Sequence, residues 1–441
     1  MKIILPEKVN TIIHTLQEKG FEAYAVGGCV RDSILGRVPD DWDITTSATP
    51  METKALFART FDTGIEHGTI TVLIDKDAFE VTTYRVDGKY EDSRHPSEVT
   101  FTRSLQEDLL RRDFTINAMA YNDIEGLVDI FGGLEDLNQK TIRCVGDAMA
   151  RFGEDALRIL RAVRFAAQLG FEIEEDTQRG ITELAPTLAN ISAERIQVEL
   201  IKMLTSPNPG MLKSAYELGI TKVILPEFDT MMQTTQENPH HKYSVGEHTL
   251  KAIGAIRADK VLRLTMLFHD IAKPMMKTMD ENGVAHFKMH DSKGAEMTKQ
   301  ILRRLKFDND TMNKVVRLVQ YHDYRMPAEP KNVRRAMNKI GEDLFPYYLE
   351  VRMADTLAQS EYLQEEKIQN IQDVRTCYEE ILKKQECVSL KTLAVTGSDL
   401  IANGMKPGKD IGAVLTKLLE YVIEHPEVNK KEVLLKIKDQ L

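Results

Sequence analysis

Hydrophobic and polar positions follow two different periods along the chain. Up to about residue 135, short runs of alternating or β-branched residues lie between helical stretches, a mixture that is typical of an α+β module. Together with the helical pattern of residues 6–20, they predict a head built on a small mixed β-sheet. The strand-type runs are EAYAVGG (22–28), ITVLID (70–75), FEVTTYR (79–85), EVTFT (98–102) and INAMAYN (116–122).

Helical periodicity replaces the strand pattern from about residue 140. In GEDALRILRAVRFAAQLGF (153–171), the apolar positions 157, 160, 163 and 167 share one stripe, and Gly170 is a typical helix end. Helical patterns continue to the end of the chain, with breaks at SPNPG, QENPHH and MKPGKD. We therefore expect everything beyond the head to be helical.

The composition is that of a soluble globular protein, with 42% hydrophobic and 29% charged residues. The first residues do not form a signal peptide and no later run is apolar enough to span a membrane, so we expect a cytoplasmic protein without a membrane role. The four cysteines are scattered without a CxxC pair, which favours reduced thiols over a zinc ribbon.

The net charge of −10 argues against indiscriminate coating of nucleic acid, because that behaviour depends on summed basic charge. A local basic groove is compatible with this balance, since arginine, whose planar fork suits phosphate, accumulates before residue 165. Solvated helix faces would explain the same residues. These arginines are Arg94, Arg103, Arg111, Arg112, Arg143, Arg151, Arg158, Arg161 and Arg164.

The segment YAVGGCVRDSILG (24–36) is a strand-type run that ends in two glycines and enters a helical pattern. Backbone N–H groups at such a turn can approach an anion closely, and a helix amino terminus attracts negative charge. Gly27 and Gly28 are therefore candidates to cradle a triphosphate, with Arg31 one turn into the helix. Glycines that serve only the turn would explain the same pair.

Three aspartates crowd the segment DDWDITTSATP (40–50). If DWDIT is a strand, Asp41 and Asp43 point to one face and Asp40 to the other. Two carboxylates on one face suit Mg²⁺ together with substrate phosphates, and two such ions can assist an in-line displacement of pyrophosphate. A turn rich in aspartate that binds nothing is the alternative; the glycine segment just before it favours the metal site.

The segment LLRRDFTINAMAYN (109–122) places two arginines and an aspartate before an apolar, strand-type run. Arg112 is a candidate clamp for phosphate, because a guanidinium fork matches phosphate oxygens. Asp113 and Asn117 could form hydrogen bonds with ribose hydroxyls. Asp113 could instead only cap a turn.

The predicted helix of residues 153–171 offers a way to read a base. Asp155 and Arg158 are three residues apart, so they can present an acceptor beside a donor fork. Cytosine and adenine each show an amine beside a ring acceptor, which this pair satisfies, whereas uracil and guanine turn a carbonyl toward the carboxylate. The pair therefore predicts a site that takes CTP and ATP and rejects UTP and GTP. An ordinary ion pair is the alternative.

The segments GGCVRDSILGRVPDDWDITTSATP, RRDFTINAMAYN and GEDALRILRAVRFAAQLGF resemble, in order and spacing, the class II tRNA nucleotidyltransferases (CCA-adding enzymes) and the related bacterial poly(A) polymerases. The resemblance implies addition of CTP and ATP to the 3′ end of tRNA without a nucleic-acid template. It also implies that Asp41 and Asp43 are the catalytic residues and ligate Mg²⁺. Nucleotide contacts are implied for Gly28, Arg31, Arg112, Asp155, Arg158, Arg161 and Arg164.

Two further segments bear on the choice within this family. GKYEDSRHPSEVTF (88–101) resembles the flexible loop of members that add the final A, which favours complete CCA addition over an A-only enzyme; a charged hairpin loop explains the same residues. LKTLAVTGSDLIANGMKPGKDIGAVLTKLLEYV (390–422) is similar to the tail that contacts the tRNA body, although it could simply join two helices. The tail and the acidic balance favour tRNA over the substrates of a poly(A) polymerase.

Histidines are unevenly distributed, with seven of the eleven between residues 240 and 322. Transition metals such as Mn²⁺, Ni²⁺, Fe or Zn²⁺ suit imidazole and carboxylate ligands better than Mg²⁺ does. Capped core or surface histidines are the alternative. Six residues resemble the metal-binding set of HD-domain phosphohydrolases, the last two at the position of a second metal: His248, His269, Asp270, Asp355, His290 and His322. This resemblance implies hydrolysis of a phosphate ester, and we expect a 2′,3′-cyclic or terminal phosphate on damaged tRNA.

We therefore expect four parts along the chain. They are a nucleotidyltransferase head (1–135), a helical neck with the nucleotide- and RNA-binding helix (136–235), an HD domain (236–360) and a helical tRNA-binding tail (361–441). The favoured function is the addition and repair of the 3′-terminal CCA of tRNA by two-metal phosphoryl transfer. The alternatives are an A-adding enzyme, a bacterial poly(A) polymerase, and an HD phosphohydrolase whose head only docks RNA.

Overall fold

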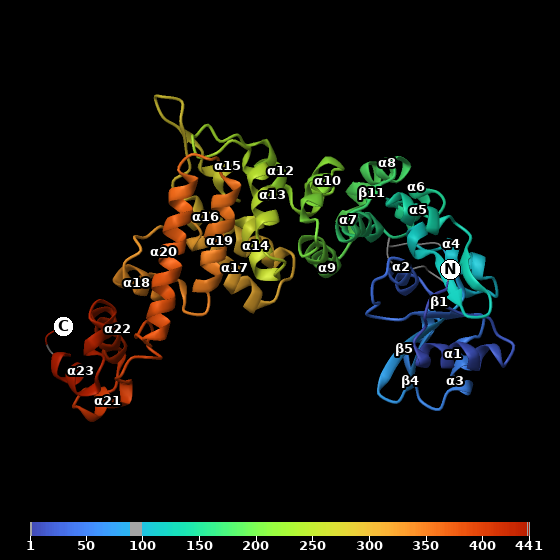
Figure 1. The fold of residues 1–441 in the computed structure, drawn as a ribbon, viewed down its shortest axis with the longest axis horizontal. Helices are drawn as coiled ribbons and strands as arrows, with labels where there is room; N and C mark the ends of the chain where they lie inside the picture. The colour runs from blue at the N-terminus through green and yellow to red at the C-terminus, as the bar shows by residue number, and fades with distance from the viewer. Residues whose placement is uncertain (1, 89–98, 439, 441) are drawn as a thin grey trace. The chain divides into compact units, whose positions relative to one another are not determined.

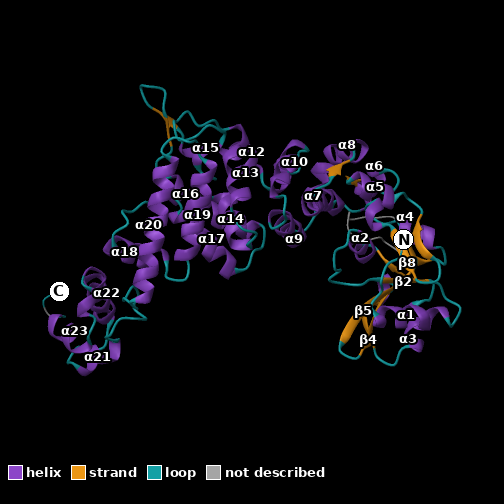
Figure 2. Ribbon diagram, viewed as in Figure 1, coloured by secondary structure: helices purple, strands orange, loops and turns teal. Residues whose placement is uncertain are grey.

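The computed structural model describes residues 2–88, 99–438 and 440. The chain folds into two compact units, Met1–Pro226 and Glu227–Leu441, which can be followed by colour in Figure 1. The predicted class is confirmed: a mixed α+β head is followed by largely helical regions (Figure 2). The division into four parts stays a prediction. All four cysteines are buried and unbridged. Within the described ranges, no helix is both long and apolar enough to cross a membrane.

A seven-stranded sheet forms the centre of the first unit. Its strands are β1 (Ala23–Val26), β2 (Ile44–Thr46), β3 (Thr60–Gly64), β4 (Thr69–Ile74), β5 (Asp77–Thr83), β8 (Met119–Asn122) and β9 (Gly126–Asp129). Their order is β3-β4-β5-β2-β1-β8-β9. Neighbouring strands run antiparallel except β2 and β5, which are parallel, so the sheet is mixed, as predicted.

The predicted strand-to-helix turn at Gly27 is present, because β1 is buried along its whole length and α2 (Gly28–Ile34) begins directly after the turn. The predicted first helix is α1 (Glu7–Gln17), which contacts β1. Its buried residues recur at helical spacing and are Val9, Ile12, Ile13 and Leu16. The other elements of the head are α3 (Pro50–Leu56), β6 (Arg85–Asp87), β7 (Val99–Phe101), α4 (Leu105–Leu110) and α5 (Gly133–Gln139).

The helix predicted over residues 153–171 is shorter at its start than expected. α6 (Ala148–Glu154) and α7 (Leu157–Leu169) are separate helices, and the backbone of Asp155 between them is extended. Gly170 ends α7 with a φ of 71°, a left-handed conformation that favours glycine, as predicted. α7 packs against α9 (Ala193–Leu204). The surrounding elements are β10 (Thr141–Ile142), β11 (Glu172–Ile173), α8 (Glu175–Leu184), α10 (Leu212–Glu217) and α11 (Thr221–Ile224).

Helices dominate the second unit, as predicted. They are α12 (Pro226–Gln233), α13 (Val245–Ala255), α14 (Lys260–Phe268), α15 (Lys273–Met276), α16 (His290–Arg304), α17 (Asn309–Tyr321), α18 (Pro330–Ile340), α19 (Phe345–Ala358), α20 (Gln364–Lys383), α21 (Gly397–Ala402), α22 (Lys409–Glu424) and α23 (Lys431–Ile437). One hydrophobic core joins α17 to α20 around Phe345, and a separate core around Leu418 holds the last helices.

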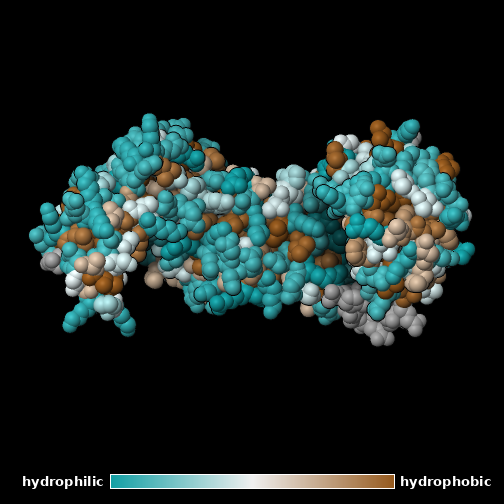
Figure 3. Space-filling model, turned by 90° about the horizontal axis from the view of Figure 1, so that it is seen from below, coloured by the Kyte–Doolittle hydropathy of each residue, from teal (hydrophilic) through white to brown (hydrophobic). Residues whose placement is uncertain are grey.

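The prediction of an entirely helical region beyond the head is wrong in two places. β10 pairs with β11 in parallel, and β12 (Thr278–Met279) forms a hairpin with β13 (Ala285–His286). Each of these strands has two residues, which is too short for a periodic signal in the sequence. In the view of Figure 3, the surface is mostly hydrophilic, with apolar side chains scattered over it.

Candidate functional site

The glycine turn before α2 allows a close approach. Gly27 has a φ of 81°, and a Cβ there would lie 3.0 Å from Nη1 of Arg112 and 3.7 Å from the carbonyl oxygen of Asn117. A left-handed backbone beside such close neighbours favours glycine over any residue with a side chain. The turn therefore brings the backbone close to a guanidinium, while the N–H of Gly27 itself donates to the carbonyl oxygen of Met119 at 3.1 Å.

Asp41 and Asp43 do not lie on a strand, which corrects the sequence prediction. β2 begins only at Ile44, and both aspartates lie exposed in the loop before it. The alternation argument therefore does not apply, but the two carboxylates still interact. Partial desolvation raises the pKa of Asp43, Arg112 lowers it and Asp41 raises it, with a net upward shift. A carboxylate pair of the kind that a divalent cation binds is present.

Glu80 is a third carboxylate at this place, and the sequence analysis missed it. It directly precedes Val81, the partner of Ile44 in the parallel pairing of β5 with β2, so it lies level with Asp43. Partial desolvation and the charges of Asp43 and Asp41 raise its pKa. A single glutamate within a strand pattern carries no signal of its own, because only the register of β2 and β5 brings it to the aspartates.

Arg112 is anchored by the fully buried carboxylate of Asp108. Its Nη2 donates to Oδ2 of Asp108 at 3.3 Å, and the hydroxyl of Thr45 donates to the same oxygen at 3.1 Å. Burial opposes the ionisation of Asp108, but Arg112 and Arg111 outweigh it and lower its pKa. Nε of Arg112 is buried and has no hydrogen-bond partner among the described residues, which leaves it able to donate to an anion.

A hydrogen-bond network joins four of the predicted nucleotide-binding residues. Nδ2 of Asn117 donates to Oδ1 of Asp113 at 3.1 Å, and Nη1 of Arg31 donates to Oδ1 of Asn117 at 2.6 Å. Nε of Arg161 on α7 donates to Oδ2 of Asp113 at 2.7 Å. Burial opposes the ionisation of Asp113, but Arg161 and Asn117 outweigh it and lower its pKa to about 2. The network ties α7 to the head beside the glycine turn.

Asp155 and Arg158 have different ion-pair partners, which corrects the expected arrangement on one helix face. Oδ2 of Asp155 accepts from Nη2 of Arg195 at 2.7 Å, whereas Nη1 of Arg158 donates to Oε2 of Glu154 at 2.7 Å. The physical reason is the break between α6 and α7, because the spacing rule for helix neighbours does not hold across it. Asp155 and Arg158 do not form an ion pair with each other either, so that alternative is also wrong.

α9 supplies partners to two of the predicted residues. Arg195 engages one oxygen of Asp155, and the other oxygen accepts from the N–H of Leu157 at 3.0 Å, so the carboxylate is fixed from both sides. Arg164 forms a buried ion pair with Glu199 at 2.9 Å, and its guanidinium lies over the ring of Phe165, as do those of Arg31 and Arg161. The sequence analysis missed Arg195, since only the packing of α7 on α9 brings it to Asp155.

In the second unit, the first group of predicted metal ligands converges. Nε2 of His248 on α13 lies 3.1 Å from Nε2 of His269, which follows α14, and 3.0 Å from Oδ1 of Asp355 on α19. Oδ2 of Asp270 lies 3.3 Å from Nε2 of His269. Two atoms about 2.1 Å from one ion, with bonds at roughly a right angle, lie about 3 Å apart. The separations therefore fit His248, His269 and Asp270 as ligands of one metal, with Asp355 in contact with His248.

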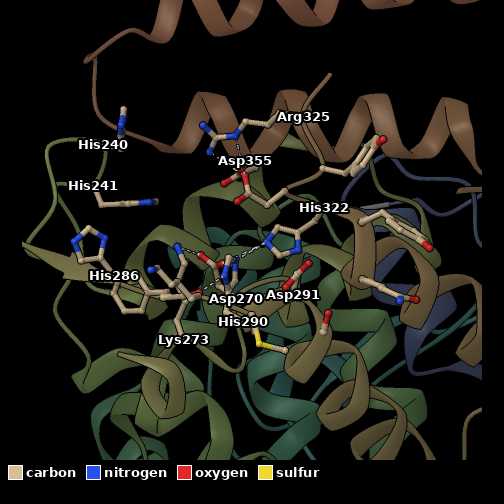
Figure 4. A pocket seen from close by; sticks show the side chains of 18 of the residues that line it. His240, His241, Asp270, Lys273, His286, His290, Asp291, His322, Arg325 and Asp355 are labelled. Atoms are coloured by element: carbon tan, nitrogen blue, oxygen red, sulfur yellow. Dashed lines mark hydrogen bonds and ion pairs between the residues drawn. The ribbon is translucent and has the colours of Figure 1, made fainter. Parts of the chain in front are cut away.

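His290 and His322 form a second group with Asp270, and Figure 4 shows the three residues together in the pocket wall. Their Nε2 atoms lie 3.1 Å apart, and Oδ1 of Asp270 lies 3.5 Å from Nε2 of His290 and 3.6 Å from Nε2 of His322. The two oxygens of Asp270 thus face different groups. His290, His322 and Oδ1 of Asp270 are the residues that would hold a second ion, the role that was expected of the two histidines.

The orientation of the four imidazoles favours a cation over an ordinary buried histidine cluster. Each Nδ1 faces a backbone carbonyl oxygen, which can only accept, so Nδ1 carries a proton and Nε2 is the ring atom left for a metal ion. The Nε2 atoms point at one another, an arrangement that a cation between them would stabilise. The Nδ1 contacts run from His248 to Ala358 (3.2 Å), His269 to Met266 (2.7 Å), His290 to Phe287 (2.7 Å) and His322 to Val319 (2.7 Å).

The pKa values of both carboxylates in this cluster lie well below the usual range. Burial raises them, but His269 and Lys273 lower the pKa of Asp270, and His248 lowers that of Asp355. Nζ of Lys273 lies 2.7 Å from Oδ2 of Asp270. A pocket of about 630 Å³ opens over the cluster, so a ligand can reach it. Carboxylate oxygens, imidazole nitrogens and access together are what a catalytic metal site requires.

Two segments bear on the choice of substrate, the predicted flexible loop and the tail. Residues 89–98, most of the predicted flexible loop, lie outside the described residues. In the tail, α21 and α22 are joined through Gly404, whose φ of 91° requires a turn there. Contact of this tail with tRNA stays a prediction, as do the roles of the individual site residues.

Three known protein families match parts of the chain. Residues 23–143 match the family described as Poly A polymerase head domain. Residues 170–232 match the probable RNA and SrmB-binding site of polymerase A, and residues 280–437 match a putative tRNA nucleotidyltransferase domain 2. None of these three descriptions names an HD domain.

Relatives and solved structures match along nearly the whole chain. The CCA-adding enzyme of Enterococcus faecalis is 36% identical, over 96% of this chain and 93% of the relative. That of Limosilactobacillus fermentum is 36% identical, over 99% and 97%. The crystal structure of the Bacillus stearothermophilus CCA-adding enzyme in complex with CTP is 30% identical, with a TM-score of 0.72 over 99% of this chain and 98% of that one. A Thermotoga maritima CCA-adding enzyme complexed with tRNA shares the fold, with a TM-score of 0.61 at 20% identity over all of both chains.

Proposed function

Because the chain belongs to the CCA-adding enzymes, a family of tRNA nucleotidyltransferases, we propose that its first unit adds C, C and A to the 3′ end of tRNA from CTP and ATP. The observation that carries this proposal is the meeting of the Gly27 turn, Arg112 and a group of carboxylates where β1 ends and β2 begins, among the inner strands of the sheet. Relatives that are CCA-adding enzymes match nearly the whole chain, which favours CCA addition to tRNA over synthesis of a poly(A) tail.

The reaction is an in-line displacement. The 3′-hydroxyl of tRNA attacks the α-phosphate of the nucleotide, forming a phosphodiester, losing its proton to water and releasing pyrophosphate. Asp41 and Asp43, with Glu80 beside them, would hold Mg²⁺, which when bound neutralises phosphate charge and makes the hydroxyl more acidic. The N–H groups at the start of α2, after Gly27, and Arg112 would bind the triphosphate, and Arg31 supports them through Asn117.

Base selection rests on Asp155 and Arg158. The carboxylate would accept from the exocyclic amine of cytosine or adenine, and the guanidinium would donate to the ring nitrogen beside it. Arg195 and the N–H of Leu157 each engage one oxygen of Asp155, which orients the carboxylate before a nucleotide binds. Specificity for CTP and ATP thus lies in the protein, without a nucleic-acid template.

Asp155→Ala should loosen base choice more than it slows transfer. We expect the preference for CTP and ATP over UTP and GTP to fall by roughly 10- to 100-fold, the range of a hydrogen bond to a charged group. The measurement is incorporation of each nucleotide in turn into tRNA that lacks CCA. The exposed Glu183 on α8 gives a matched control, Glu183→Ala, with unchanged selectivity. Equal discrimination in Asp155→Ala and wild type would contradict the role.

For the second unit, we propose a two-metal phosphohydrolase centre of the HD type. His248, His269, Asp270 and Asp355 would hold one ion, and Asp270 would share a second with the two remaining histidines. Mn²⁺, Ni²⁺, Fe or Zn²⁺ suits these ligands, and the chemistry that a bound metal supplies is a hydroxide nucleophile near neutral pH. Convergence of four Nε2 atoms on two buried carboxylates whose pKa values are lowered supports the proposal.

The substrate that we propose for this centre is a 2′,3′-cyclic or terminal phosphate on a damaged tRNA end. Water would form a bond to phosphorus, one ribose ester bond would break, and the released ribose oxygen would take a proton. Removal of the remaining monoester by a second hydrolysis would leave the free 3′-hydroxyl on which nucleotide addition depends. The two activities in one chain would then act in sequence on the same RNA end.

A further inference from the structure

Lysine and arginine side chains line the pocket over the metal-ligand cluster together with its aspartates. Lys273 is paired with the metal ligand Asp270, at 2.7 Å. Further cationic or imidazole side chains line the wall, and Figure 4 shows two of them, Arg325 and His240, on the Asp355 side of the pocket. The wall includes His240, His241, Lys288, Arg325 and Lys339.

Lys367 on α20 adds an ammonium group to this side. Its Nζ donates to Oε1 of Gln359 at 2.7 Å and to Nδ1 of His240 at 3.1 Å. Both acceptors are uncharged, and both residues line the pocket. Nε2 of Gln359 donates in turn to Oδ2 of Asp355 at 3.1 Å. One glutamine therefore separates Lys367 from a metal ligand.

The positive charges of Lys367, Arg325 and protonated His240 repel one another as long as no anion is bound beside them. Desolvation, Arg325 and Arg352 lower the pKa of Lys367 against the effect of Asp355, and desolvation, Lys367 and Arg325 lower the pKa of His240. Arg325 has one carboxylate partner, Asp323, at 2.9 Å. Like charges held together beside an accessible pocket favour a bound anion.

The geometry of this side is fixed by the fold. The N–H of Ser360 donates to the carbonyl oxygen of His240 at 2.9 Å, and its hydroxyl donates to that of Pro239 at 2.6 Å. The ring of His240 also lies 4.9 Å from that of Tyr362. The segment that carries His240 is thus tied to the connection between α19 and α20, so the donors are positioned before a ligand arrives.

We propose that Arg325, Lys367 and His240 form a second phosphate-binding site, the distal phosphate site, beside the metal cluster. The inference rests on the phosphohydrolase function proposed above and narrows its substrate. The ligand is a nucleotide with one phosphate at its reacting 2′,3′ end and another on its 5′ side. Every RNA 3′ end has this second phosphate, because the preceding phosphodiester supplies it, and a cyclic mononucleotide lacks it. The site therefore selects RNA ends over free mononucleotides.

Adenosine 2′,3′-cyclic phosphate and its 5′-phosphorylated form test this proposal, because they differ by one phosphate. With metal-loaded wild type, we expect a kcat/KM roughly tenfold higher for the 5′-phosphorylated probe, through a lower KM. In Lys367→Met, that ratio should fall to about one. Because the ratio compares two probes in the same variant, a change in hydrolysis that is common to both does not alter it. Lys383→Met, an exposed lysine at the end of the same helix, should keep the wild-type ratio.

A binding measurement distinguishes a failure of the distal phosphate site from a failure of the phosphohydrolase. Metal-free protein is titrated with both probes, and the ratio of their Kd values should be about tenfold in wild type and near one in Lys367→Met. Arg325→Met should behave in the same way, which guards against a folding defect in one variant. A wild-type ratio near one, or an equal loss for both probes in Lys367→Met, would overturn the distal phosphate site. Hydrolysis of neither probe by metal-loaded wild type would instead refute the phosphohydrolase, and the Kd ratios would then decide the phosphate site alone.

Discussion

Asp43→Asn should reduce transfer from both CTP and ATP by about 10³-fold or more. Asp43 lies beside Asp41 and Glu80. An amide there would remove a negative charge from the proposed Mg²⁺ site and would cost several kcal/mol of transition-state stabilisation. The loss should be the same for both nucleotides, because the metal site acts on the triphosphate and not on the base. The measurement is single-turnover extension of tRNA that lacks CCA.

Asp40→Asn is the matched control for this variant. Asp40 is also exposed in the loop before β2, and the sequence analysis gave it no role as a ligand. It should keep transfer within a few-fold of wild type, and the thermal unfolding midpoints of both variants should match that of wild type. Near-normal transfer by Asp43→Asn would refute the metal assignment.

Asp270→Asn should abolish metal-dependent phosphodiester hydrolysis and reduce the metal content of the second unit. Asp270 is the one carboxylate that faces both histidine groups, so its loss removes a ligand from each proposed metal. CCA addition should continue, because its residues lie in the first unit. Metal content by elemental analysis and hydrolysis of a 2′,3′-cyclic phosphate provide two independent readouts.

Asp310→Asn, at an exposed ion pair with Lys314, serves as the control in the same unit. It should keep both the metal and the hydrolysis. If Asp270→Asn hydrolyses the cyclic phosphate as fast as wild type, the HD centre is not where the account places it. If instead it loses tRNA extension together with hydrolysis, the two activities do not have the separate sites that we assign.

Features that depend on neighbouring residues could be predicted from the sequence. The turn at Gly27 follows a strand pattern and begins a helix, and Gly170 ends an amphipathic stripe, so both are local signals. Resemblance also grouped six histidine and aspartate residues, although the sequence could not show that the two oxygens of Asp270 face different histidine pairs. That arrangement depends on how separate helices pack.

Contacts that depend on strand register and helix packing could not be predicted from the sequence. Asp41 and Asp43 have a two-residue spacing that suits a strand, but β2 begins after them. Glu80 reaches them only through the pairing of β2 with β5. Asp155 lies at a helix break that periodicity did not reveal, and Arg195 meets it only because α9 packs on α7. Each of these was decided by residues distant in the sequence.

The length and sequence of the product made on one tRNA test the account most directly. Wild-type protein is incubated with Mg²⁺, CTP and ATP, and with tRNA that ends just before CCA, beside an unrelated RNA of similar length. The account predicts that the tRNA gains C, C and A and that extension then stops, while the unrelated RNA is not extended. A long run of A on either RNA, or no addition to the tRNA, would contradict it.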